Sequence, residues 1–441
     1  MEGNKILGKV KIGENDEILI SENDIISNKA ELLHILESRI NHWKAEDVLN
    51  IAMAFHNSSD SETFLNILTM STNPEHSLNL HGTGVVFSIN EKKERNLCLL
   101  NALASYYILS FIKERDEEKK EQAYNNATTN INRADTIEMC DKRSMINKGF
   151  LLFANGQLDV AHQFFSNVLE IQENHILALY GKGAISYNYG KYPEALKYFI
   201  SILKIAPYSS LPSRMCIGLC HYKLGNIQKA QMAFERQLEL DPNNHNCLVY
   251  LAIINLNNSI QNCHSKELVY NHSNQSGNLI EIGLKLLEKA HLKNPNNILC
   301  LLHLSNHYFL VEKYKKAEKL AKRGLWLLEQ YKIIGGSNNY QSNAKGGYKF
   351  GDDIKCLRSE IYSMMGKIYH IENNYNKAYK YYSSAVQANP QNFSAIYSLG
   401  QCLFYLRNYK EALNSLKSVA AQSLYENDIN LLKVLLIYTI F

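Results

Sequence analysis

The stretch YGKGAISYNYGKYPEALKYFISILKIAP (180–207) is followed by RMCIGLCHYKLGNIQKAQMAFERQLELDP (214–242), and the two stretches share a spaced pattern of residue types. A glycine, an alanine, a phenylalanine and a proline each return after 35 residues. The matched pairs are Gly183 and Gly218, Ala195 and Ala230, Phe199 and Phe234, and Pro207 and Pro242. Because proline ends a helix, each stretch is expected to be one structural unit that finishes at its proline.

The repeated residues have a packing explanation. A glycine inside a helix costs about 1 kcal/mol relative to alanine, so its return indicates that another helix approaches closely at that point. Ala195 allows the same approach on the second helix, while Phe199 fills the space between successive units. This pattern is typical of the tetratricopeptide repeat, a pair of antiparallel helices. The sequence therefore predicts an all-α fold, a right-handed α-solenoid of tetratricopeptide helix hairpins.

The rest of the chain is predicted to extend this array in both directions. The expected segments are a short extended N-terminal arm (1–30), divergent repeats (31–139), a repeat array (142–331) with an inserted loop at about 259–277, a flexible loop (332–353), and C-terminal repeats (354–441). In the arm, Val10, Ile12, Ile18 and Ile20 alternate around a polar turn, as they would on two strand faces. Because the chain ends in LLKVLLIYTIF without a polar capping helix, we expect the array to be cut off and the natural protein to be longer.

Composition excludes several classes of function. The net charge is +4 and basic residues are interleaved with acids, so we expect no direct nucleic-acid site. The apolar C-terminal run has eleven residues, too few to span a bilayer, so no membrane association is expected. Nine scattered cysteines and an N-terminus without an apolar signal core indicate a reducing compartment, nuclear or cytosolic.

The candidates for catalytic or metal chemistry are weak. Cys216, Cys220 and His221 are clustered, but no second pair follows at zinc-finger spacing, so small buried thiols are the better interpretation. The chain contains no HExxH pair, no GxSxG turn, and no Gly-Lys-Ser/Thr phosphate loop. We therefore predict a protein that is not an enzyme, with no catalytic residues, no metal site and no cofactor.

The concave face of the predicted solenoid is the candidate binding site. The first helices turn apolar and aromatic positions toward it, and so many exposed side chains would form a larger bare patch than soluble proteins usually keep. The predicted partner-binding groove consists of Ile146, Phe150, Phe153, Tyr180, Tyr187, Met215, Tyr222, Ile253, Leu302 and Phe309. The alternative is that individual members pack on neighbouring first helices.

Specific runs also carry a family resemblance. The two quoted stretches, then LVYLAIINLNN (248–258), GLKLLEKAHLKNPNN (283–297) and LHLSNHYFLVEKYKKAEKLA (302–321), follow one another in a characteristic order. From about residue 9 to residue 430 the chain resembles the N-terminal half of the large tetratricopeptide (Cln-three-requiring) scaffold subunits of the RNA polymerase II-associated factor (PAF) elongation complex. Members of that family are about twice as long.

This resemblance implies a nuclear, non-enzymatic scaffold of transcription elongation. In that family the repeats embrace the polymerase-associated factor subunit and parafibromin, and the assembly contacts elongating RNA polymerase II and promotes histone modification. Two alternatives stay open: a repeat subunit of the anaphase-promoting ubiquitin ligase, which would dimerise through its N-terminal repeats, and the repeat region of a glycosyltransferase.

Overall fold

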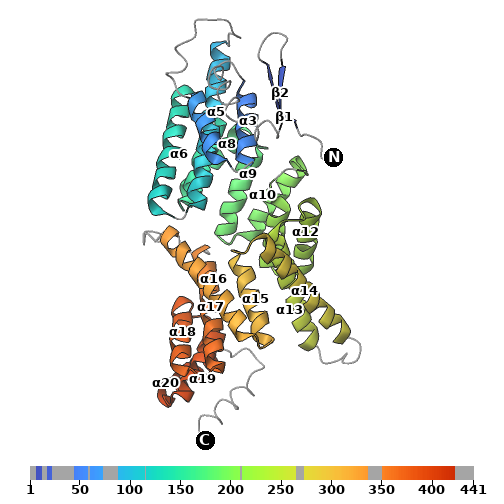
Figure 1. Cartoon of the computed structure of the whole chain (residues 1–441), viewed down its shortest axis with the longest axis vertical. Helices are drawn as coiled ribbons and strands as arrows, with labels where there is room; N and C mark the ends of the chain where they lie inside the picture. Colours follow the sequence, from blue (N-terminus) through green and yellow to red (C-terminus); the bar gives the residue numbers. More distant parts are fainter. Residues whose placement is uncertain are drawn as a thin grey trace. The chain divides into compact units, whose positions relative to one another are not determined.

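The structure is a computed structural model. It describes residues 6–11, 17–21, 44–57, 60–72, 88–114, 116–208, 211–264, 273–335 and 350–422, without the side chains of 6–21, 259–278, 331–352 and 420–422. The chain consists of two compact units, Met1–Lys182 and Gly183–Phe441, and Figure 1 shows that helix hairpins make up both. Their boundary falls inside one helix, α9 (Ile176–Asn188).

The first unit begins with a β-hairpin and continues as helix pairs. Strand β1 (Ile6–Lys11) pairs antiparallel with β2 (Glu17–Ser21), and Val10 lies opposite Ile18. This hairpin lies in the segment expected to be an extended arm, although Ile12 is outside the described residues. The helices that follow are α3 (Ala45–Asn57), α4 (Ser61–Thr72), α5 (Ile89–Lys113), α6 (Glu117–Ile137), α7 (Lys142–Ala154) and α8 (Leu158–Ile171).

The second unit begins with the last turns of α9 and consists of helix pairs. Its helices are α10 (Tyr192–Ile205), α11 (Ser213–Lys223), α12 (Ile227–Leu240), α13 (His245–His264), α14 (Ser273–Lys293), α15 (Ile298–Leu310), α16 (Tyr314–Gly335), α17 (Phe350–Ile371), α18 (Tyr375–Ala388), α19 (Phe393–Tyr405) and α20 (Tyr409–Gln422). Successive helices pair as α11 with α12, α13 with α14, α15 with α16, α17 with α18, and α19 with α20. The predicted all-α fold of tetratricopeptide hairpins is confirmed.

The repeated glycines lie where a phenylalanine ring meets the first helix. A Cβ atom on Gly183 would lie 2.8 Å from Cε1 of Phe199, and one on Gly218 would lie 2.6 Å from Cε1 of Phe234. Both rings are almost completely buried. Any side chain at these glycines would push the second helix away, so the spacing seen in the sequence follows directly from the packing.

Helices extend into both segments that were predicted to be loops. Helix α13 continues to His264 and α14 begins at Ser273, so both helices extend into the segment 259–277. Residues 259–264 contain neither glycine nor proline, and nothing in them stops the helix. In the same way α16 continues to Gly335 and α17 begins at Phe350, inside the segment expected to be a loop at 332–353.

Helix α5 is long and apolar enough to cross a membrane by length and composition alone. Its apolar residues are used in packing. Leu97 and Leu100 contact Ala134 of α6, and Ile108 and Phe111 belong to a cluster shared with α6 and α7. The apolar character of α5 is therefore explained by the core of the first unit.

Candidate partner-binding groove

The ten predicted groove residues are less exposed than the sequence suggested. Ile146, Ile253 and Leu302 are buried, with 4%, 5% and 7% of their surface exposed. The other seven, which are half-buried, are Phe150, Phe153, Tyr180, Tyr187, Met215, Tyr222 and Phe309. The expectation of a broad bare apolar surface is therefore wrong for the three buried residues, which belong to the core.

Ring–ring contacts account for the partial burial of the aromatic members. Tyr187 packs edge-on against Tyr192, with ring centroids 5.3 Å apart, and Phe309 packs in the same way against Tyr314 at 5.6 Å. In the first unit, Phe150 lies edge-on to Phe165 at 5.1 Å. Each ring keeps part of its surface accessible while its other side contacts its own hairpin.

A tyrosine that sequence reasoning did not single out links two neighbouring hairpins. Tyr250 of α13 contacts Tyr222 of α11 with centroids 5.8 Å apart, and it stacks on Phe234 of α12 at 5.4 Å and an interplanar angle of 12°. When positions are counted along α13, Tyr250 is not among those expected to face the groove, but it is next to one of them in the sequence. Tyr250 makes these contacts only because its hairpin packs against the preceding one.

The N-terminal part of α17 reaches this aromatic region. Helix α17 begins 16 residues before Gly366, whereas α19 begins seven residues before the equivalent Gly400, so its first two turns are an extension of the repeat. Asp353 lies in this extension, and its Oδ1 atom is 3.1 Å from Nζ of Lys223 at the end of α11. The chain itself therefore places a charged helix end beside the end of α11, which carries Tyr222 of the predicted groove.

Besides burial, the carboxylate of Asp353 contributes to the raised pKa values of two tyrosines in this region, Tyr187 and Tyr250. Burial, and after it the Asp353 carboxylate, raises the pKa of Tyr250 to about 12. Burial is also the main cause of the raised pKa of Tyr187, to which Asp353 adds. These hydroxyls stay protonated at neutral pH, so they can donate hydrogen bonds to carbonyl or carboxylate oxygens of a bound segment.

Two opposite charges on α17 also face this region. Burial raises the pKa of the Glu360 carboxyl group and lowers the pKa of the Lys367 amine, and each group partly offsets the shift of the other. Glu360 also adds to the raised pKa of Tyr222, whose first cause is burial. Glu360 is exposed and Lys367 is half-buried, so the lysine is the charge that would interact more strongly with a partner than a fully solvated group does.

The cysteine cluster is part of the hairpin core. Cys216 and Cys220 on α11 are both buried, and burial raises the pKa of Cys220 to about 12, which disfavours the thiolate that a metal needs. Within the described ranges, no group of three or more histidine, cysteine, aspartate or glutamate side chains is placed to hold a metal ion.

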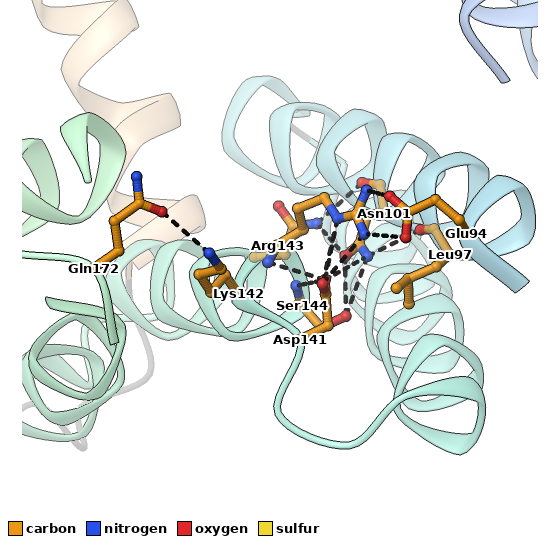
Figure 2. A network of polar contacts seen from close by, with 9 residues as sticks. Glu94, Leu97, Asn101, Asp141, Lys142, Arg143, Ser144 and Gln172 are labelled. Atoms are coloured by element: carbon orange, nitrogen blue, oxygen red, sulfur yellow. Dashed lines mark hydrogen bonds and ion pairs between the residues drawn. The ribbon is translucent and has the colours of Figure 1, made fainter. Parts of the chain in front are cut away.

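A polar network in the first unit joins α5 to α7 (Figure 2). Asp141 caps α7 by accepting hydrogen bonds from the backbone N–H groups of Arg143 and Ser144. Arg143 donates to both carboxylate oxygens of Glu94, at 2.8 and 3.1 Å, and Asn101 donates to Ser144 Oγ at 3.1 Å. These groups satisfy one another, so the network positions the two helices.

The fold is that of a tetratricopeptide-repeat solenoid. The family model described as "Tetratricopeptide repeat" matches residues 214–244, and the one described as "Anaphase-promoting complex, cyclosome, subunit 3" matches residues 358–419.

Over most of its length the chain is similar to CTR9 proteins. It is 25% identical to "RNA polymerase-associated protein CTR9" of Caenorhabditis elegans, over 93% of this chain and 32% of that protein. It is 28% identical to "Protein CTR9 homolog" of Arabidopsis thaliana, over 78% of this chain and 28% of that protein. The resemblance seen in the sequence is thereby confirmed. The expected length is corrected, because the chain spans about a third of these relatives and not a half.

A solved structure supports the fold. The crystal structure of the APC/C hetero-tetramer Cut9-Hcn1 matches with a TM-score of 0.53 and 12% identity, covering 95% of this chain and 71% of that chain. At this low identity the match shows the repeat fold alone.

Proposed function

We propose that the chain is a non-enzymatic scaffold of the PAF transcription elongation complex, which holds partner subunits in its groove. The similarity to an RNA polymerase-associated protein over 93% of the chain carries this proposal. The expected partners are the polymerase-associated factor subunit and parafibromin, with RNA polymerase II reached indirectly through them. We further propose a nuclear location and a supporting role in elongation and histone modification.

The groove suits an extended segment that brings apolar side chains and backbone polar groups. Tyr187, Tyr222 and Phe309 keep accessible ring surface, which apolar anchors of a partner would cover. The hydroxyl groups of the tyrosines and the charges of Glu360 and Lys367 could pair with polar groups of the same segment. The buried Ile253 and Leu302, which pack with Tyr222 and Phe309 respectively, would support these residues from below.

Affinity capture from nuclear extract followed by mass spectrometry tests the proposal. The tagged full chain should recover elongation factors, and the variant Tyr187→Ala/Tyr222→Ala/Phe309→Ala should lose them while its circular dichroism stays helical. Tyr198→Ala is the matched control, because Tyr198 is a half-buried tyrosine on the second helix α10. Recovery of chaperones or ubiquitin-ligase subunits in place of elongation factors would reject the proposal, and unchanged capture by the triple variant would reject the groove.

A ubiquitin-ligase subunit is the second candidate, because the family model for subunit 3 of the anaphase-promoting complex matches α17–α20. That match covers two hairpins, whereas the CTR9 similarity covers most of the chain. Light scattering of the full chain distinguishes the two, since a tight homodimer formed by the N-terminal repeats favours the ligase subunit.

A further inference from the structure

Positive charge is concentrated on one helix, α16. The eleven residues 313–323 contain six basic residues and one acid, although the whole chain has a net charge of only +4. All six basic side chains are exposed; they are Lys313, Lys315, Lys316, Lys319, Lys322 and Arg323. The expectation that basic residues are interleaved with acids along the chain is therefore wrong for this helix.

The packing of α16 fixes the direction of these charges. Ala317, Ala321 and Leu328 are buried in a cluster with residues of α17, and they occupy one side of the helix. Lys315, Lys319 and Lys322 follow at intervals of four and three, so they share the opposite side. The helix cannot turn this basic face away from solvent without exposing its core.

The acid within this stretch is already engaged. Glu318 accepts a hydrogen bond from the hydroxyl group of Tyr369 and forms an ion pair with Lys322, both at 2.7 Å. Lys377 of α18 lies over the ring of Tyr369, 5.3 Å from its centroid, so the positive charge continues onto the next hairpin. Among the residues that the structure describes, Lys315 and Lys319 form no ion pair.

Exposed apolar side chains lie at both ends of the basic face. Leu310 and Val311, which precede α16, are 72% and 47% exposed, and Trp326 beyond Arg323 is 48% exposed. The stretch from Lys315 to Trp326 is about 17 Å long, which about five residues of extended chain would cover. A ligand with anionic groups in its middle and apolar groups at its ends fits this pattern.

We propose that this face of α16 docks an acidic polypeptide segment, rich in aspartate and glutamate and flanked by apolar residues. Charge complementarity is the main argument. A polypeptide is favoured over a nucleic acid for two reasons. Tyr369 and Tyr381 stack on each other, with centroids 5.4 Å apart, and Lys377 covers Tyr369, so these two rings offer little surface to bases, and the exposed Trp326 lies beyond the basic residues in the sequence and not among them. Five of the six basic residues are lysines, which pair with single carboxylates as point charges.

Fluorescence anisotropy tests the proposal. The measurement is the affinity of the full chain for a labelled peptide that is rich in Asp and Glu and carries a leucine at each end. Binding should weaken as salt is raised and should be lost with the Asn/Gln analogue of the peptide. Neutralising two lysines, Lys315→Gln/Lys319→Gln, should weaken binding about fivefold. The matched control Lys197→Gln/Lys204→Gln, two exposed lysines on α10, should change it less than about twofold.

Several results would overturn this proposal. The acidic peptide could fail to bind at low salt, bind no better than its Asn/Gln analogue, or lose equal affinity in both lysine variants. A single-stranded oligonucleotide, or a phosphatidylserine-containing vesicle, that binds α16 more tightly than the peptide at the same salt would assign the face to another ligand. Thermal unfolding of both variants verifies the fold, and the groove variant of the previous section should keep full peptide affinity.

Discussion

Lys223 and Asp353 are 130 positions apart in the sequence, yet their side chains form an ion pair with an Nζ–Oδ1 distance of 3.1 Å. The contact joins the end of α11 to the extended start of α17, across the hairpins that lie between them in the chain. It places helix α17 against the tyrosines of the proposed groove, so a bound segment must either pass beside this helix end or displace it.

Breaking this ion pair should have a small effect on stability. The Lys223 and Asp353 side chains are 30% and 34% exposed, and pairs with this much solvent contribute less than about 1 kcal/mol. A double-mutant cycle with Lys223→Gln and Asp353→Asn, measured by urea unfolding of the full chain, gives the coupling free energy. Amide hydrogen exchange in the first turns of α17 should become faster in both single variants. A coupling several times larger would contradict this expectation and would mean that the pair is a main anchor of the start of α17.

Adding a methyl group at Gly218 should destabilise the second unit. Alanine improves helix propensity by about 1 kcal/mol, but overpacking costs about 1–3 kcal/mol, so we expect a net loss of about 1 kcal/mol. The loss arises because the new Cβ would lie 2.6 Å from the buried ring of Phe234. The double variant Gly218→Ala/Phe234→Leu should recover part of the loss in thermal unfolding.

Gly225→Ala is the matched control for this test. Gly225 has a φ angle of +76° and no atom within 4 Å of the added Cβ, so its loss of about 1–2 kcal/mol would come from the backbone alone. Phe234→Leu should therefore not rescue it. If the same leucine rescued both alanine variants, the steric explanation for Gly218 would fail.

Removing the ring of Phe165 should strongly destabilise the first unit. This ring is fully buried and lies within 2.7 Å of the Cβ position at Gly149 and within 2.5 Å of that at Gly181, so it fills the space between α7 and α9. Phe165→Ala should cost about 3–5 kcal/mol in urea unfolding. Phe164→Ala, at the adjacent half-buried phenylalanine, should cost less than half as much. If both variants lost the same free energy of unfolding, the close packing of the Phe165 ring against Gly149 and Gly181 would not explain the loss.

These glycine and phenylalanine contacts explain why the fold could be predicted from the sequence. Gly183 with Phe199 and Gly218 with Phe234 are contacts within one hairpin. The two residues of each contact are therefore separated by the same number of positions in each repeat, and the sequence shows this interval directly. Helix ends in polar segments could not be predicted as well. Residues 259–264 are polar enough for a loop, but they contain no residue that stops α13.

The candidate groove was harder to predict than the fold. Position counting identified Tyr187, Tyr222 and Phe309, which keep accessible surface, but it also selected Ile253 and Leu302, which are buried by the neighbouring hairpins. Tyr250 and the contact of Asp353 with Lys223 depend on how successive hairpins stack, and no periodic pattern within one repeat encodes that stacking.

His303 should make the second unit less stable in mild acid. Burial on α15 lowers the pKa of His303 to about 4, whereas in the unfolded chain it is about 6.5. Above pH 6.5 both states are neutral and the histidine has no effect. As the pH falls from about 6.5 toward about 4, the unfolded state takes up a proton that the folded state refuses, so stability is lost.

The loss from His303 should be on the order of 2 kcal/mol between pH 7 and pH 5. Urea unfolding of the full chain and of His303→Asn at both pH values measures it, and the variant should lose correspondingly less stability on acidification. Burial also lowers the pKa of His175, His221, His307 and His370, so acid should still destabilise the variant to some extent. His370→Asn is a useful comparison, because His370 is packed among the tyrosine rings Tyr375, Tyr382 and Tyr405, and burial lowers its pKa as well. An identical pH dependence in wild type and His303→Asn would show that His303 is protonated in the folded protein.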